Sequence, residues 1–131
     1  MTVERISVES RAAREWIDVT DRVAQVVAGL ATTPQAVLLF CPHTTAAVTV
    51  NEGYDPAVAS DVQRALDAQV PQVPFHHAEG NSPAHLMTSL VGPSVLVPVE
   101  GKRLQLGRWQ RIFFCEFDGP RRRELWVQPL G

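Results

Sequence analysis

Four histidines stand out among the side chains of this sequence that could carry out chemistry. His76, His77 and His85 fall within one short segment, and His43 lies in a polar stretch between two apolar runs. Neutral imidazole is the commonest protein ligand for transition metals, so clustered histidines favour a metal site. None of the four lies inside an apolar stripe that would mark it as core packing. The alternative is a set of surface or hydrogen-bonded structural histidines.

Local geometry indicates which imidazoles could meet. Adjacent side chains in an extended segment point to opposite sides, so only one of His76 and His77 should join His85, and we favour His77. Gly80 lets the backbone between them turn back. His85 falls in the first turn of an expected helix, where the helix dipole keeps the ring neutral, as a metal requires. With His43 added, three nitrogen ligands would leave one position for water or substrate, as in catalytic zinc sites.

Cys41 offers a different chemistry at the same place. Cys41 and His43 lie two residues apart, so on an extended strand they face the same way and could form a nucleophile and base pair. Cys41 also ends an apolar run, and buried cysteines mostly serve as packing, as we expect for Cys115. With two cysteines and no CxxC pair, neither a disulfide framework nor a thiolate zinc cluster is expected.

Carboxylates and arginines could complete a site. Glu52 directly follows the second apolar run and is the best candidate for an acid or base. The other carboxylates considered are Asp55, Asp61, Glu79, Glu116 and Asp118. Arg108 and Arg111 flank an aromatic face at Trp109, which is typical of a ligand platform. The triple-arginine run 121–123 is more typical of a solvated hairpin.

Hydrophobic periodicity predicts the elements that position these residues. Alternating residues before Thr20 predict an opening hairpin, and helical spacing predicts helices beginning near Thr20, Asp55 and Ser82, each behind a capping residue. The run Ala36–Cys41 predicts a strand buried on both faces, followed by a strand at Ala46–Val50. Two successive hairpins are expected from strands at Val95–Val99, Leu104–Leu106, Ile112–Phe117 and Leu125–Val127.

Composition indicates a folded globular domain. The 131 residues, 45% hydrophobic and 20% charged, suit a single domain over residues 1–131. About seven strands with two or three helices in mixed order favour an α+β fold. A net charge of −2 argues against nucleic-acid binding through a basic surface. Without a signal-peptide pattern or an apolar run near the roughly 20 residues of a membrane span, we expect a cytoplasmic protein with no membrane partner.

Several short motifs match one known family in order and spacing. They are His43-Thr44-Thr45-Ala46, Asn51-Glu52 with Asp55-Pro56, Pro83-Ala84-His85, Leu106-Gly107-Arg108-Trp109-Gln110 and Glu116-Phe117-Asp118-Gly119-Pro120-Arg121. Together they resemble the YjbQ-like family over nearly the whole chain. The resemblance implies a single YjbQ-like domain with a mixed, buckled, barrel-like sheet of about seven strands and two to three helices. It also implies a homotrimer and a metal-binding histidine cluster.

The resemblance extends to particular residues. By position, the family's histidines correspond to His43, His77 and His85, the same three that spacing and local geometry select. The candidates for catalytic roles are Glu52 and Arg108. The candidates for substrate contacts are Thr44, Thr45, Asn51, Trp109 and Gln110. Two features depart from the family: Arg111 stands where a small residue often follows the Trp-Gln pair, and the loop from His77 to His85 is shorter than in many relatives.

Some family members are described as secondary thiamine-phosphate synthases. Such an enzyme joins a hydroxymethylpyrimidine diphosphate to a thiazole phosphate and releases pyrophosphate, whose charge a metal and arginines would stabilise. Imidazole ligands favour Zn²⁺, whereas pyrophosphate chemistry usually recruits Mg²⁺ through carboxylates. We therefore expect a metal-dependent enzyme acting on a small, phosphorylated molecule. The alternatives are a non-catalytic trimeric protein that binds a metal or an anion, and an enzyme with a cysteine nucleophile.

Overall fold

The computed structural model describes residues 2–71 and 73–131, in which eight strands and three helices form. The strands are β1 (Glu4–Glu9), β2 (Glu15–Asp18), β3 (Ala36–Phe40), β4 (Ala46–Glu52), β5 (Ser94–Glu100), β6 (Arg103–Leu104), β7 (Gln110–Glu116) and β8 (Arg122–Leu130). The helices are α1 (Thr20–Ala28), α2 (Pro56–Ala68) and α3 (Ser82–Val91). The expected α+β class is confirmed, with three helices and a curled, half-barrel arrangement of strands.

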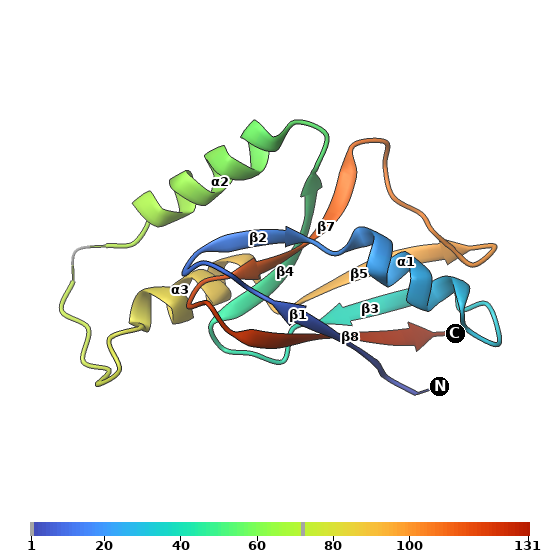
Figure 1. The fold of residues 1–131 in the computed structure, drawn as a ribbon, viewed down its shortest axis with the longest axis horizontal. Coiled ribbons are helices and arrows are strands. Elements are labelled where there is room, and N and C mark those ends of the chain that lie inside the picture. Colours follow the sequence, from blue (N-terminus) through green and yellow to red (C-terminus); the bar gives the residue numbers. More distant parts are fainter. Residues whose placement is uncertain (1, 72) are drawn as a thin grey trace.

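The strands form two sheets (Figure 1). One has the order β1-β8-β3-β5-β6, and the other has the order β2-β7-β4. The paired strands run antiparallel in both sheets. The β4 and β7 pair extends furthest, from Ala46 opposite Glu116 to Glu52 opposite Gln110. The predicted site residues near Ala46 and those near Glu52 therefore lie at opposite ends of this strand pair.

Two of the expected hairpins are wrong. β1 and β2 follow one another in the chain, but β1 pairs with β8 and β2 pairs with β7. Likewise, β7 and β8 lie in different sheets. The connecting turns carry the chain from one sheet to the other, because both sheets must bury their apolar faces against a common core. The β5 and β6 hairpin is confirmed, with positive φ angles at Gly101 and Lys102 in its turn.

The main core lies between the two sheets and α1. Val27 of α1, Leu39 of β3, Phe114 of β7 and Leu125 of β8 are all 0% exposed and belong to this core. Along β3, Val37 and Leu39 are buried, whereas the residues between and beside them are half-buried or exposed. The prediction that this strand is buried on both faces is therefore wrong. Its second face lies on the outside of the five-stranded sheet.

Helix α2 begins as the sequence predicts. The side chain of Asp55 accepts a hydrogen bond from the backbone N–H of Ala57 at 2.9 Å, and Pro56 occupies the first turn. None of the residues of α2 is fully buried. Its apolar stripe packs against the rest of the fold through half-buried residues such as Leu66. Figure 1 accordingly shows α2 projecting from the body of the fold.

The other two helices begin near the expected residues without the expected caps. Thr20 is the first residue of α1, and Asp18 accepts hydrogen bonds from its backbone N–H and its hydroxyl at 3.0 and 2.7 Å. Ser82 is the first residue of α3, and the Asn81 side chain before it donates to Asp118 instead of capping the helix. The side chain of Asn81 is therefore committed to another part of the chain.

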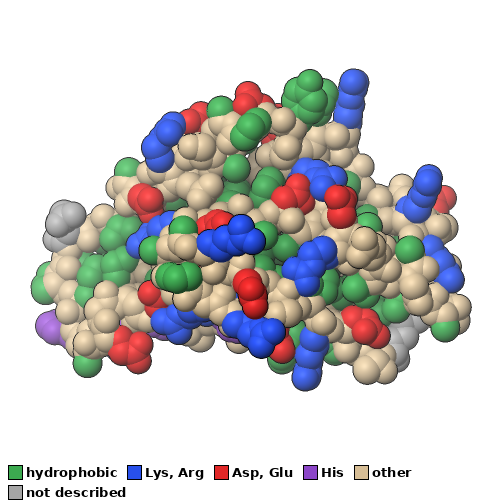
Figure 2. Space-filling model, viewed as in Figure 1, with side chains coloured by type: hydrophobic (Ala, Val, Ile, Leu, Met, Phe, Trp, Pro, Cys, Tyr) green, Lys and Arg blue, Asp and Glu red, His purple; other side chains and the backbone are tan. Residues whose placement is uncertain are grey.

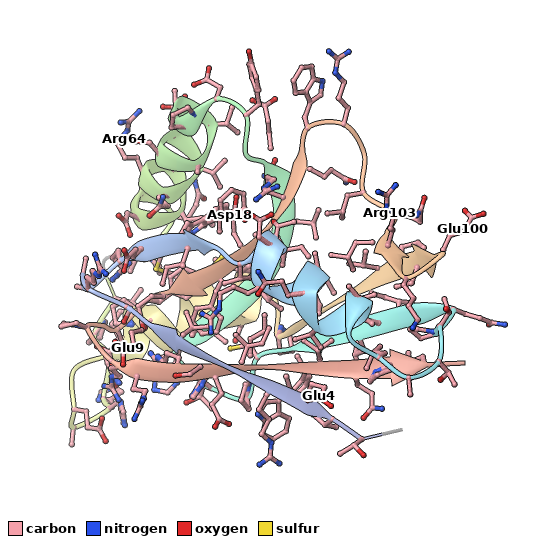
Figure 3. All side chains as sticks on the ribbon, turned by 45° about the vertical axis from the view of Figure 1, so that its right-hand side comes forward. Glu4, Glu9, Asp18, Arg64, Glu100 and Arg103 are labelled. Carbon is pink, nitrogen blue, oxygen red and sulfur yellow. The ribbon has the colours of Figure 1, made fainter. Side chains whose placement is uncertain are left out.

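Charged side chains of both signs are mixed over the outer surface. Figure 2 shows acidic and basic groups interspersed on one face, with histidine at its lower margin. Exposed groups such as Glu4, Glu9 and Arg64 lie apart from one another around the molecule (Figure 3). Within residues 2–71 and 73–131, no helix is long and apolar enough to cross a membrane.

Candidate functional site

A polar pocket of about 360 Å³, which we call the histidine pocket, lies where the β3–β4 loop faces the start of α3 and the turn before β8. It is lined by Pro42, His43, Thr44, Thr45, His77, Glu79, Asn81, His85, Arg121 and Arg123. The structure thus brings His43, His77 and His85 to one pocket from three separate segments. His76 is exposed and does not line it.

The backbone holds His43 in a defined position. Its Nε2 atom accepts a hydrogen bond from the backbone N–H of Glu124 at 2.9 Å, and its ring meets that of Phe114 edge-on at 6.4 Å. Burial and the nearby Arg123 guanidinium lower the pKa of His43. The ring is therefore neutral, with its proton on Nδ1. In this arrangement Nε2 has no free lone pair to offer a metal.

His77 and His85 lie beside one another. Their ring centres are 5.4 Å apart and the ring planes meet at 81°. Two imidazoles sharing a tetrahedral zinc ion at Zn–N distances of about 2.0–2.1 Å would have ring centres about 5 Å apart. The distance between the two ring centres is therefore close to that of two imidazole ligands of one metal ion. No three His, Cys, Asp or Glu side chains in the described part of the chain are grouped closely enough to hold a metal together.

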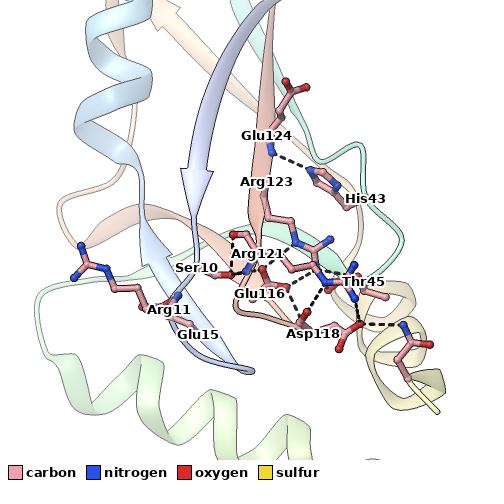
Figure 4. Close-up of polar contacts among 11 residues, drawn as sticks. Ser10, Arg11, Glu15, His43, Thr45, Glu116, Asp118, Arg121, Arg123 and Glu124 are labelled. Carbon is pink, nitrogen blue, oxygen red and sulfur yellow. Dashed lines mark hydrogen bonds and ion pairs between the residues drawn. The ribbon is translucent and has the colours of Figure 1, made fainter. Parts of the chain in front are cut away.

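Behind the pocket lies a buried ion pair between Glu116 and Arg123, which are 0% and 4% exposed (Figure 4). The carboxylate accepts hydrogen bonds from Arg123 Nε at 2.9 Å, Ser10 Oγ at 2.6 Å and the backbone N–H of Asp118 at 3.0 Å. Burial alone would raise the pKa of Glu116, but these hydrogen bonds outweigh it and hold the pKa below its usual value. Glu116 is therefore an anion inside the protein.

The same ion pair holds the histidine loop. Arg123 Nη2 donates to the carbonyl oxygen and the hydroxyl of Thr45 at 3.2 and 2.8 Å. Thr45, a predicted substrate contact, is 5% exposed, and its hydroxyl serves this structural contact. The interpretation of run 121–123 as a solvated hairpin is wrong for Arg123. Arg123, Leu125 and Val127 alternate along β8 and share its buried face, a pattern already present in the sequence.

Arg121 is held in the same manner by Asp118. Its Nε donates to the Asp118 carbonyl and its Nη2 to the Asp118 carboxylate, both at 2.8 Å. The same carboxylate oxygen accepts a hydrogen bond from Asn81 Nδ2 at 2.9 Å. Arg121 is half exposed and faces the pocket. Arg122, between the two lining arginines, lies on the outer face beside Glu9.

The remaining predicted residues lie at the other end of the β4 and β7 pair. Glu52 lies six residues along β4 from Ala46, so this end is about 20 Å from the histidine loop at roughly 3.3 Å per residue. Asn51 and Gln110 contact the backbone near their own positions. A single chain does not bring Glu52, Arg108, Asn51, Trp109 and Gln110 to the histidines. Their roles stay predictions.

That far end has a surface of its own. The Arg108 guanidinium lies 4.6 Å above the Trp109 ring, and Tyr54 contacts the same ring at 4.8 Å between centres. Together with Asp18 and Arg111 they line a second depression of about 420 Å³. Arg111 donates to Asp18 at 2.8 Å, so its departure from the family pattern has a structural role.

Cys41 lacks the properties of a nucleophile. It is 2% exposed, and burial raises the pKa of its thiol to about 11, so the thiolate is scarce at neutral pH. Cys115 is also buried, and burial raises its thiol pKa further. These properties disfavour the cysteine-nucleophile alternative.

The family pattern described as UPF0047 protein YjbQ-like matches residues 4–131 of the chain. The chain is 41% identical to UPF0047 protein YugU of Bacillus subtilis, covering 98% of this chain and 99% of the relative. It is similar to a crystal structure of an uncharacterized YjbQ/UPF0047 protein from Clostridium acetobutylicum, with a TM-score of 0.91, 40% identity and 97% and 99% coverage of the two chains. A YbjQ-like protein of unknown function from Sulfolobus solfataricus gives a TM-score of 0.92 at 31% identity, covering 99% and 96%.

Proposed function

The chain belongs to the UPF0047 YjbQ-like family, and we propose that its histidine pocket is a metal-dependent site for a small phosphorylated molecule. The observation that carries this proposal is the meeting of His77 and His85 at 5.4 Å, in a pocket that two arginines also line. We propose a transfer reaction like that of thiamine-phosphate synthases as its activity. We also propose that the protein is cytoplasmic.

His77 and His85 would hold the metal, with zinc the best match for imidazole donors and magnesium the choice for a pyrophosphate-releasing step. The metal would supply positive charge to a leaving phosphate group. Glu79 lines the same pocket, but its carboxylate would have to move closer to the two histidines to join them as a ligand. For His43 to act as a third ligand through Nε2, this atom would have to give up the hydrogen bond that it accepts from the Glu124 N–H. As the ring stands, the Nδ1 proton can donate to a substrate oxygen.

The test compares His85→Ala with His76→Ala as a matched control, because His76 lies outside the pocket. Metal content of the purified proteins is measured before and after chelation, together with turnover of the two thiamine precursors. We expect His85→Ala to lose both metal and turnover, and His76→Ala to retain both. Unchanged turnover in a metal-free His85→Ala protein would refute the metal-enzyme proposal.

The second candidate is a non-catalytic trimeric protein that uses the same pocket to hold a metal or an anion. The outer face of the five-stranded sheet favours assembly with further copies of the chain, because Leu96 of β5 and Leu130 of β8, on either side of β3, are 62% and 40% exposed. Stoichiometric metal without turnover of either thiamine precursor, in a protein that assembles as a trimer, would favour this candidate.

A further inference from the structure

The histidine pocket is one half of a longer cleft. An apolar pocket of about 680 Å³ shares Pro42, His43, Thr44 and His85 with it. The apolar half is completed by Phe40, Cys41, Thr88, Ser89, Pro93 and Trp126. A ligand that spans the shared wall would therefore meet polar groups at one end and aromatic and aliphatic surface at the other.

Each of the two arginines of the polar half is anchored by one acidic residue. Each gives its Nε and Nη2 to one acidic residue, Arg121 to Asp118 and Arg123 to Glu116. The third nitrogen of each, Nη1, has no hydrogen-bond partner in the described part of the chain. Neither Asp118 nor Glu116 lines the pocket. Because Arg123 is 4% exposed, its guanidinium is held rigidly in the wall of the pocket.

Two buried polar atoms along the cleft lack partners as well. Asn81 lines the polar half and Thr88 the apolar half, and the buried Asn81 Oδ1 and Thr88 Oγ1 atoms make no hydrogen bond to the described residues. The orientation of the Asn81 amide is fixed, because its Nδ2 donates to the Asp118 carboxylate. Buried polar groups in folded proteins are almost always paired, so these two atoms leave hydrogen-bonding capacity beside the cleft that the described residues do not use.

Trp126 gives the apolar half a defined wall. Its indole N–H donates to the Glu124 carboxylate at 2.9 Å, and the Arg5 guanidinium lies 5.0 Å from its ring centre. Phe40 contacts the same ring, with centres 5.9 Å apart. Arg5 and Phe40 flank Trp126 from the strands on either side of β8, so the indole lines the apolar half as part of a row of side chains on the outer face of the sheet.

We infer that the cleft binds an organic oxyanion with a flat apolar body. This inference rests on the proposed function and names its class of ligand. The anionic group accepts hydrogen bonds from Nη1 of Arg121 and Arg123, which suit phosphate and carboxylate oxygens alike. The body lies against Trp126 in the apolar half.

Calorimetric titration of the full-length protein with phenyl phosphate, benzoate and inorganic phosphate tests this inference. We expect phenyl phosphate or benzoate to bind at least about tenfold more tightly than inorganic phosphate, because only the organic probes fill the apolar half. Whichever organic probe binds more tightly identifies the anion as phosphate or carboxylate. Equal affinity for phenyl phosphate and inorganic phosphate would overturn the assignment of the apolar half.

Arg121→Gln and Arg122→Gln form a matched pair, because Arg122 lies on the outer face. We expect Arg121→Gln to weaken binding of the organic probe by about tenfold or more and Arg122→Gln to leave it unchanged. Equal effects of the two substitutions would overturn the anion site. Ser89→Phe, which fills part of the apolar half, should weaken phenyl phosphate and spare inorganic phosphate.

Metal content of the same samples separates this inference from the proposed function. A metal-loaded protein that binds none of the three probes would refute the oxyanion site and leave the metal site standing. Tight probe binding by a protein that never takes up metal would support the oxyanion site and refute the metal-dependent function.

Discussion

Glu116 is a charged residue inside the protein, since its carboxylate is fully buried against Arg123. We predict that Glu116→Gln lowers the free energy of unfolding by about 3 kcal/mol or more, because it leaves the guanidinium buried without a counter-charge. Urea denaturation measures the change. Glu9→Gln is the control: Glu9 faces Arg122 at the surface, so we expect a change within about 0.5 kcal/mol. Equal losses in both variants would contradict the buried-pair interpretation.

The same carboxylate predicts a pH dependence of stability. Its pKa is held below the usual 4.5, so the folded state favours the ionised form more strongly than the unfolded state does. Its contribution is fully present above about pH 4.5 and is lost as the pH falls from there toward the folded pKa. Unfolding free energies measured between neutral and acid pH should fall less steeply below pH 4.5 in Glu116→Gln. Parallel curves for the two proteins would contradict this assignment.

At the scale of elements, the turn between β7 and β8 allows the chain to change sheets. A Cβ atom on Gly119 would lie 2.3 Å from the carbonyl oxygen of Ala12 and 2.7 Å from Ser10 Oγ. We predict that Gly119→Ala lowers the melting temperature markedly, because backbone must move to admit the methyl group. Gly29→Ala is the control, since its nearest contact would be 3.5 Å. Thermal unfolding measures both, and a Gly119→Ala protein as stable as Gly29→Ala would contradict the close approach.

Local patterns predicted the elements better than their pairing. The Asp55 cap and the starts of all three helices follow from residues that act within one or two turns. The hairpins at either end of the chain were wrong because strand pairing depends on which apolar faces meet, and short turns between strands do not determine it.

The candidate site was also predicted only in part from the sequence. Histidine clustering and family likeness selected three residues that do line one pocket. Arg123 was missed because an arginine in a charged run looks solvated until its strand is known to face inward. The separation of Glu52 from the histidines follows from the β4 and β7 register, which no motif spacing expresses.

For the whole molecule, the exposed apolar face of the five-stranded sheet is the feature most in need of a partner. We predict that Leu96→Glu, which places a charge on this face, converts the proposed trimer to monomers. Light scattering after size-exclusion chromatography measures the mass. Glu100→Gln, an exposed change at the end of the same strand, should leave assembly intact. A Leu96→Glu protein with unchanged mass would place the interface elsewhere.

Glu124 links the two halves of the cleft. Its backbone N–H binds the His43 ring and its carboxylate binds the Trp126 indole. The imidazole beside the anionic end and the indole beside the apolar end are therefore both held by one residue of β8, which fixes their separation in this structure. A cleft with such a fixed span should discriminate among ligands by length, rejecting those whose anionic group and ring are joined by too long or too short a linker.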